Sequence, residues 1–138
     1  MMAMPSDLPP SPFFPFSHRF VRAERLKSRK IIGSLFKGGE SLVAYPLRVV
    51  WTVLPPDVTS EFPAQVSISV SKRLFKTAVA RNRLKRQIRE AYRLQKAAFY
   101  EKLVGRRIAL MLMYIAKEPL PYTEIEKGVR KMVRKFPG

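Results

Sequence analysis

The side chains that could carry hydrolytic chemistry are few and scattered along this chain. Its 138 residues include ten aspartates and glutamates, one histidine and no cysteine. Metal-dependent nucleases hold their ions with clustered carboxylates, but no two of these acids are spaced as a pair of metal ligands. Without cysteine a thiolate zinc site is excluded, and neither His18 nor Ser71 has a catalytic partner near it in the sequence. The sequence therefore predicts no catalytic residue and no metal site of its own.

Basic side chains, in contrast, are concentrated in one segment. Residues 71–96 contain ten lysines and arginines and a single acid, Glu90, so this segment contributes +9 to a net charge of +17. A compact protein with so large a charge repels itself unless a polyanion offsets the repulsion. Nucleic acid is the commonest such partner, and an acidic membrane surface is the second.

Most of this basic segment lies in a predicted helix, over residues 77–103, that has two different sides. At 100° per residue, one side is mostly apolar and suited to packing on a sheet. It comprises Leu84, Ile88, Ala91, Tyr92, Gln95 and Phe99. The opposite side is a cationic face made of Asn82, Lys85, Arg86, Arg89, Arg93 and Lys96. Arg83 and Glu90 fall on a flank, and Arg81 falls beside the apolar edge.

The cationic face stacks like charges one turn apart, at Lys85, Arg89 and Arg93. Solvated surface helices usually alternate the sign of their charges, because like pairs at this spacing are unfavourable. A purely solvated basic surface is therefore the weaker interpretation. Arginine forks bind phosphate groups with two parallel hydrogen bonds, so the face predicts contact with a nucleic acid.

The remaining segments are predicted to form one small α/β domain over residues 19–138. Strand-forming residues and alternation of apolar with polar residues predict strands at residues 41–45, 47–54, 65–70 and 107–114. A first helix is predicted to follow Ser28 as its N-cap and to end at Gly38-Gly39, and its apolar stripe is Ile31, Ile32, Leu35 and Phe36. A last helix is predicted over residues 122–136. Five prolines make residues 1–18 an irregular tail.

No segment is predicted to cross or enter a membrane. The longest apolar stretch, residues 108–116, is shorter than the roughly 18 residues that a spanning helix needs. The beginning of the chain also lacks a basic segment followed by an apolar one, as a secretory signal would have. We therefore expect a cytoplasmic protein.

The basic segment resembles the signature of the bacterial ribonuclease P protein family. That signature is carried by Val70-Ser71-Lys72-Arg73 and by the run Ala78-Val79-Ala80-Arg81-Asn82-Arg83-Leu84-Lys85-Arg86-Gln87-Ile88-Arg89-Glu90-Ala91. Arg25-Leu26-Lys27-Ser28 and Leu35-Phe36-Lys37-Gly38-Gly39 are similar to the family's first helix and its approach. The order of elements agrees over about residues 25–136.

This resemblance implies a fold and a set of RNA contacts. The fold is a two-layer α/β (α+β) sandwich with a four-stranded mixed sheet, three helices and a left-handed βαβ crossover through the basic helix. The residues that it implies for binding the RNA subunit and substrate are Arg81, Asn82, Arg83, Lys85, Arg86 and Arg89. From the basic segment we add Lys72, Arg73 and Arg93.

The resemblance also implies a cleft, between the first helix and the sheet, for the single-stranded 5′ leader of precursor tRNA. Phe36 matches an aromatic residue of its wall, although a helix stripe could equally bury Phe36 in the core. Ile32 and Val50 stand where the family often has further aromatic residues, so this chain departs from the family pattern at two positions of the cleft. Trp51 could replace the second one only if the strand shifted by one residue, which would also turn it to the other face.

In the family, RNA with Mg²⁺ performs the hydrolysis, so the partners implied are ribonuclease P RNA and precursor tRNA, with no protein partner or membrane. Two other classes fit the charge: a purely structural RNA-binding protein, such as a ribosomal protein, and a protein that binds DNA or a membrane surface. The Arg81-Asn82-Arg83 signature favours the first interpretation. A membrane binder would expose its apolar face, which this helix needs for the sheet.

Overall fold

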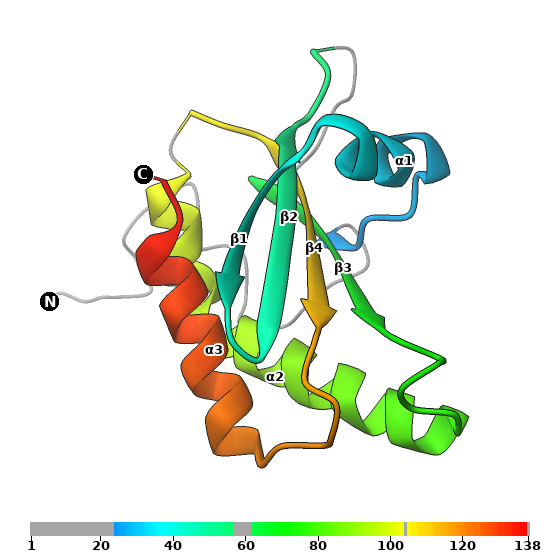
Figure 1. Ribbon diagram of the computed structural model, residues 1–138. Coiled ribbons are helices and arrows are strands. Elements are labelled where there is room, and N and C mark those ends of the chain that lie inside the picture. The colour runs from blue at the N-terminus through cyan, green and yellow to red at the C-terminus, as the bar shows by residue number, and fades with distance from the viewer. Residues whose placement is uncertain (1–23, 57–61, 104, 138) are drawn as a thin grey trace, which may run out of the picture.

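The computed structural model describes residues 24–56, 62–103 and 105–137, and the proline-rich tail predicted for residues 1–18 lies outside them (Figure 1). Three helices and four strands follow the predicted order. They are α1 (Arg29–Gly38), β1 (Glu40–Ala44), β2 (Leu47–Val53), β3 (Ala64–Val70), α2 (Ala78–Lys102), β4 (Ile108–Tyr114) and α3 (Tyr122–Lys135). Each differs from its predicted bounds by no more than one residue at either end.

The four strands form one mixed sheet in the order β1-β2-β4-β3. β2 pairs antiparallel with β1 and β4, whereas β3 and β4 are parallel and are joined through α2. In Figure 1 both parallel strands run downward with α2 behind the sheet, and β4 lies to the left of β3. This is the left-handed sense, which very few such connections have. The predicted fold class is confirmed.

The two faces of the sheet bury two separate clusters. Helices α2 and α3 cover one face and enclose the larger cluster, which includes Trp51, Leu110, Val66 and Phe136. Helix α1 covers part of the other face, over Val50 and Met111. Val50 pairs with Met111, and Trp51 pairs with Leu110. The strand therefore has the predicted register, with Val50 toward α1 and Trp51 on the opposite face.

The predicted helix ends are present and have local causes. The Ser28 hydroxyl accepts a hydrogen bond from the Ile31 amide at 3.3 Å, and the Thr77 hydroxyl accepts one from the Ala80 amide at 3.2 Å. These N-caps satisfy amides that have no partner within the helix. After α2, Gly105 adopts a φ of +78°, a conformation that favours glycine. The chain then turns back into β4.

The segment before α1 runs along the outer edge of β3. The Leu26 amide donates to the Val66 carbonyl at 2.9 Å, and Arg25 forms a parallel bridge with Val66. Edge strands are commonly protected in this way. The pairing also carries Glu24 and Arg25 to the side of α2.

Candidate nucleic-acid interface

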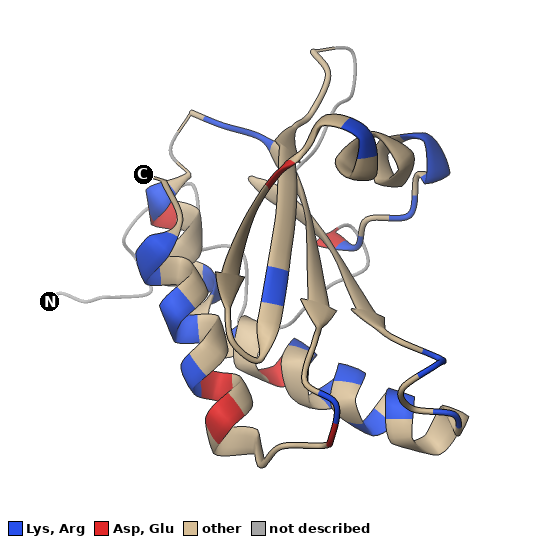
Figure 2. Ribbon diagram, in the orientation of Figure 1, with Lys and Arg blue, Asp and Glu red and all other residues tan. Residues whose placement is uncertain are grey.

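The solvent side of α2 carries the predicted cationic face. Asn82, Arg83 and Arg86 are exposed, and Lys85 and Arg89 are half-buried. None of them forms an ion pair with an acid of the described residues. The surface continues into the β3–α2 loop, where Lys72 and Arg73 are exposed. Figure 2 shows these basic residues following one another along the loop and α2. The structure thus brings most of the predicted RNA-binding residues onto one surface.

Arg81 has a different environment from the other basic residues of this surface. Its guanidinium donates to the carbonyls of Phe75 and Lys76, at 2.8 and 3.0 Å. These contacts tie the β3–α2 loop to the first turn of the helix. The side chain is half-buried and lies along the molecule, as the helical wheel predicted. Arg81 therefore positions the loop that carries Lys72 and Arg73.

Arg93 is on the predicted side of α2, but its charge is paired. Its guanidinium donates to both carboxylate oxygens of Glu90, at 3.0 and 2.5 Å. This hydrogen bonding holds the pKa of the Glu90 carboxyl below its usual value and raises the pKa of Arg93. The cationic face is thus partly neutralised at this end.

The helical-wheel prediction for Lys96 is wrong. The wheel placed it on the cationic face, but its side chain is only 3% exposed and its ammonium lies 3.0 Å from the Glu24 carboxylate. Lys96 is at the edge of that face nearest the buried Tyr92, and the chain segment before α1 covers this edge. The cationic face therefore ends before Lys96.

A groove at the edge of β3 adds residues that sequence reasoning missed. It is lined by Arg25, Leu26, Lys27, Val66, Ser67, Ile68, Lys85 and Arg89. The Nε of Arg89 is buried here and has no hydrogen-bond partner. Burial, followed by the nearby charges of Arg25 and Arg86, lowers the pKa of Arg89. Such a concentration of cations around a buried donor suits an anion such as a phosphate.

Arg25 and Lys27 belong to a segment far from α2 in the sequence, and only its pairing with β3 places them beside Lys85 and Arg89. The resemblance drew on Arg25 and Lys27 only as part of the approach to the first helix. No periodicity could have assigned them to this surface.

The predicted leader cleft corresponds to the partly covered sheet face beside α1. Phe36 is 60% exposed, so the alternative in which it is a core residue is wrong. Ile32 is half-buried at the edge of the smaller cluster. Val50 is buried beneath α1, where it packs with Ile31 and Leu35. It therefore helps to hold α1 on the sheet.

The open remainder of this sheet face is formed by residues that were not among the predicted site residues. Strand pairing aligns Arg48 with Met113 and Met113 with Ser69, on the same face as Val50. Arg48 is exposed, whereas Met113, Ser67 and Ser69 are half-buried. The alternation of β2 could have indicated Arg48, which is two residues before Val50. This surface offers the Arg48 guanidinium, the hydroxyls of Ser67 and Ser69, and the exposed ring of Phe36.

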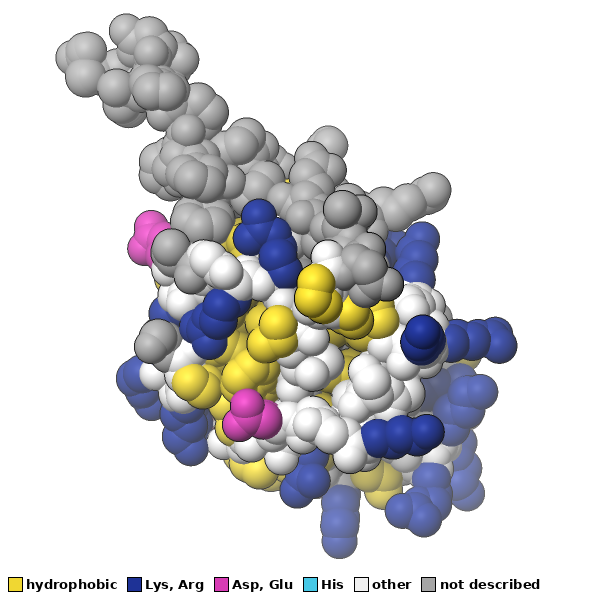
Figure 3. Space-filling view, turned by 90° about the horizontal axis from the view of Figure 1, so that it is seen from above, with side chains coloured by type: hydrophobic (Ala, Val, Ile, Leu, Met, Phe, Trp, Pro, Cys, Tyr) yellow, Lys and Arg dark blue, Asp and Glu magenta, His cyan; other side chains and the backbone are white. Residues whose placement is uncertain are grey.

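Basic side chains also occur away from α2. In Figure 3, which views the molecule from the end opposite the β1–β2 turn, they line much of the rim, and acidic side chains are sparse among the described atoms. The described part of the chain contains no group of three His, Asp or Glu residues that could hold a metal ion. The helices of the described residues also include none with the length and hydropathy that a membrane-spanning segment needs.

Comparison with known proteins identifies the family of this chain. The family model described as Ribonuclease P matches residues 20–137. A ribonuclease P protein component from Porphyromonas gingivalis (strain ATCC 33277) is 36% identical over 129 residues, which covers 90% of both chains. One from Chlorobium phaeobacteroides is 35% identical over 100 residues, which covers 67% of this chain and 68% of the relative.

Solved structures show the same fold. The ribonuclease P protein of Thermotoga maritima superimposes with a TM-score of 0.65 at 22% identity and covers 83% of this chain and 99% of its own. That of Staphylococcus aureus gives a TM-score of 0.61 at 24% identity, with 82% and 94% covered. The family model and the curated relatives together show that the chain belongs to the ribonuclease P protein family.

Proposed function

We propose that this protein is the protein subunit of ribonuclease P and supports cleavage of precursor tRNA at its 5′ end in the cytoplasm. Its family supports a partnership with ribonuclease P RNA and a part in tRNA processing. The observation that carries the proposal is the cationic face of α2. Arg86 and Arg89 lie there, with Arg83 on its flank, and none of the three has an acidic partner in the described chain. RNA phosphates would relieve their mutual repulsion.

The two surfaces are proposed to have separate roles. The cationic face and the β3–α2 loop bind the catalytic RNA. The open sheet face beside α1 binds the single-stranded 5′ leader, with the exposed ring of Phe36 available to stack on a base. Arg48 adds a cation on the same face. An RNA strand crossing this face would meet hydroxyl donors and one stacking group.

We further propose that hydrolysis takes place in the RNA subunit with Mg²⁺. Protein nucleases hold their catalytic metal ions with clustered carboxylates, and the described side chains do not form such a group. The contribution of this chain is electrostatic. Its cations reduce the repulsion between two polyanions, the catalytic RNA and the precursor, which would otherwise require more Mg²⁺.

Reconstitution tests the proposal. The full chain is mixed with a bacterial ribonuclease P RNA and a precursor tRNA at low Mg²⁺, and cleavage at the mature 5′ end is measured. We expect faster cleavage than with the RNA alone. Equal rates with and without protein would contradict the role as a subunit and favour a purely structural RNA-binding protein. Cleavage by the protein without RNA would contradict the assignment of hydrolysis to RNA.

A further inference from the structure

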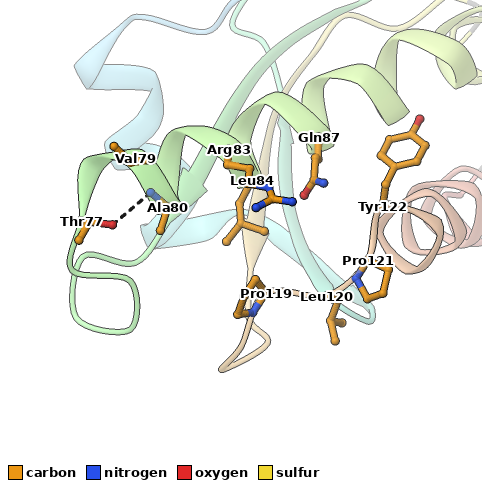
Figure 4. Close-up of a pocket in the computed structure, with 10 residues that line it drawn as sticks. All are labelled: Thr77, Val79, Ala80, Arg83, Leu84, Gln87, Pro119, Leu120, Pro121 and Tyr122. Carbon is orange, nitrogen blue, oxygen red and sulfur yellow. Dashed lines mark hydrogen bonds between the residues drawn. The ribbon is translucent and has the colours of Figure 1, made fainter.

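A second groove lies on α2 beside the cationic face, against the loop between β4 and α3. Its volume is about 510 Å³, within the range of about 300–1,000 Å³ typical of small-molecule sites. Figure 4 shows the two sides of the groove, with α2 on one side and the proline-containing loop on the other. The lining residues are Thr77, Val79, Ala80, Arg83, Leu84, Gln87, Pro119, Leu120, Pro121 and Tyr122.

The groove combines apolar walls with two planar polar groups. Arg83 and Gln87 extend side by side from α2 toward the loop (Figure 4). No hydrogen bond or ion pair joins either side chain to another described residue. Leu84, Leu120 and the two prolines provide apolar surface around them. A flat ligand with polar edges would satisfy both kinds of lining.

The loop side of the groove is held in place by the protein itself. The Tyr114 hydroxyl donates to the Glu118 carbonyl at 2.8 Å and accepts from the Leu120 amide at 2.9 Å. The Thr77 cap fixes the start of α2 on the other side. Binding would therefore require little ordering of the backbone, which favours affinity.

An apolar residue that does not pack in the core, Val79, lines this groove. Val79 is 80% exposed, although it belongs to the helix that presents the cationic face. Arg83 is one turn from Arg86, so the groove adjoins that face directly. Val79 lines the groove together with Leu120 and the two prolines, so its side chain adds to the apolar surface that the groove offers a ligand.

We propose that this groove receives an unstacked purine base from the RNA bound on the cationic face of α2. The inference rests on the proposed function. The Arg83 fork matches the two acceptors on the edge of guanine, and the Gln87 amide matches the donor and acceptor of adenine. The apolar walls suit the faces of a base. A phosphate is the poorer fit, because Arg83 is the only cation among the described residues of the lining. The base could come from the catalytic RNA or from the precursor.

Photocross-linking distinguishes these two sources. The photoreactive residue p-benzoylphenylalanine replaces Val79 in the full chain, and the assembled holoenzyme is irradiated with precursor tRNA bound. We expect a cross-link to one or a few unpaired purines, and primer extension on each RNA identifies the strand. The matched control places the same residue at Leu94, which is on the same helix, 45% exposed and outside the groove. Equal or dispersed cross-linking from both positions, or a link between two protein chains, would overturn the proposal.

An affinity measurement provides the second test. Removing the mapped base, by an abasic substitution in that RNA, should weaken binding of the wild-type protein about tenfold, the scale of one stacked base. The Gln87→Leu protein should bind about tenfold more weakly and lose its sensitivity to the abasic site, with circular dichroism confirming its fold. If the abasic RNA binds as well as intact RNA while Arg86→Ala still weakens binding, the groove proposal fails and the proposed function stands. If Arg86→Ala also has no effect, the proposed function fails.

Discussion

The Glu24 carboxylate and the Lys96 ammonium lie 3.0 Å apart, with 0% and 3% of their side chains exposed. The Tyr100 hydroxyl donates to the second carboxylate oxygen of Glu24, and burial raises the pKa of Tyr100, so this hydroxyl keeps its proton. The pair joins the segment before α1 to the middle of α2. It therefore helps to hold Arg25 and Lys27 beside the cationic face.

Lys96→Met should lower the free energy of unfolding by about 3–5 kcal/mol, because it leaves a buried carboxylate without its countercharge. The double variant Glu24→Leu/Lys96→Met should recover much of this loss, since the buried charge is then absent. Urea unfolding measures both. A Lys96→Met protein of unchanged stability but weaker RNA binding would place Lys96 on the RNA-contact surface instead.

Arg93→Ala should weaken RNA binding less than Arg86→Ala, because Arg93 is already paired with Glu90 whereas Arg86 has no such partner in the described ranges. Glu90→Gln should strengthen RNA binding by releasing Arg93. The measurement is titration of labelled ribonuclease P RNA at constant salt, with circular dichroism as a folding control. Equal losses for Arg86→Ala and Arg93→Ala would show that RNA displaces Glu90 from Arg93.

Salt dependence should report how many phosphates the cationic face contacts. If about five cationic side chains contact phosphates, the slope of log K against log[salt] should be about −3 to −4. Arg89→Ala should make the slope shallower by about 1, since its buried Nε and the adjoining charge of Arg25 suit a phosphate at this position. Binding isotherms from low to moderate salt test this. A slope near zero for the wild-type protein would rule out the basic helix as the contact.

Phe36→Ala should reduce affinity for a precursor with a 5′ leader about tenfold while changing stability little, because the ring is 60% exposed and one stacked base is worth roughly 1–3 kcal/mol. Ile32→Phe should increase that affinity by adding a second ring one turn earlier. Mature tRNA without a leader is the control ligand, and its affinity should not change in either variant. A large loss of stability in Phe36→Ala would show that the ring supports the core.

The elements of this fold were predictable because their causes are local. Caps at Ser28 and Thr77 and the glycines after α1 and α2 fix element ends within short windows of sequence. Strand-forming residues indicate β2, and alternation of apolar and polar residues indicates β3 and its buried face. The same periodicity located the centre of the cationic face at Asn82 and Arg86. The handedness of the crossover came only from the family resemblance, since the usual rule favours the opposite sense.

The sequence by itself therefore determined the order of the elements, the family and the helix that carries the charge. Tertiary structure decided which cationic side chains remain available to bind RNA. Pairing of residues 24–26 with the β3 edge buried Lys96 and brought Arg25 to Arg89, and partial coverage by α1 left Phe36 exposed while burying Val50. The physical reason is that periodicity specifies the side of an element on which a residue lies, whereas the segment packed against that side comes from elsewhere in the chain.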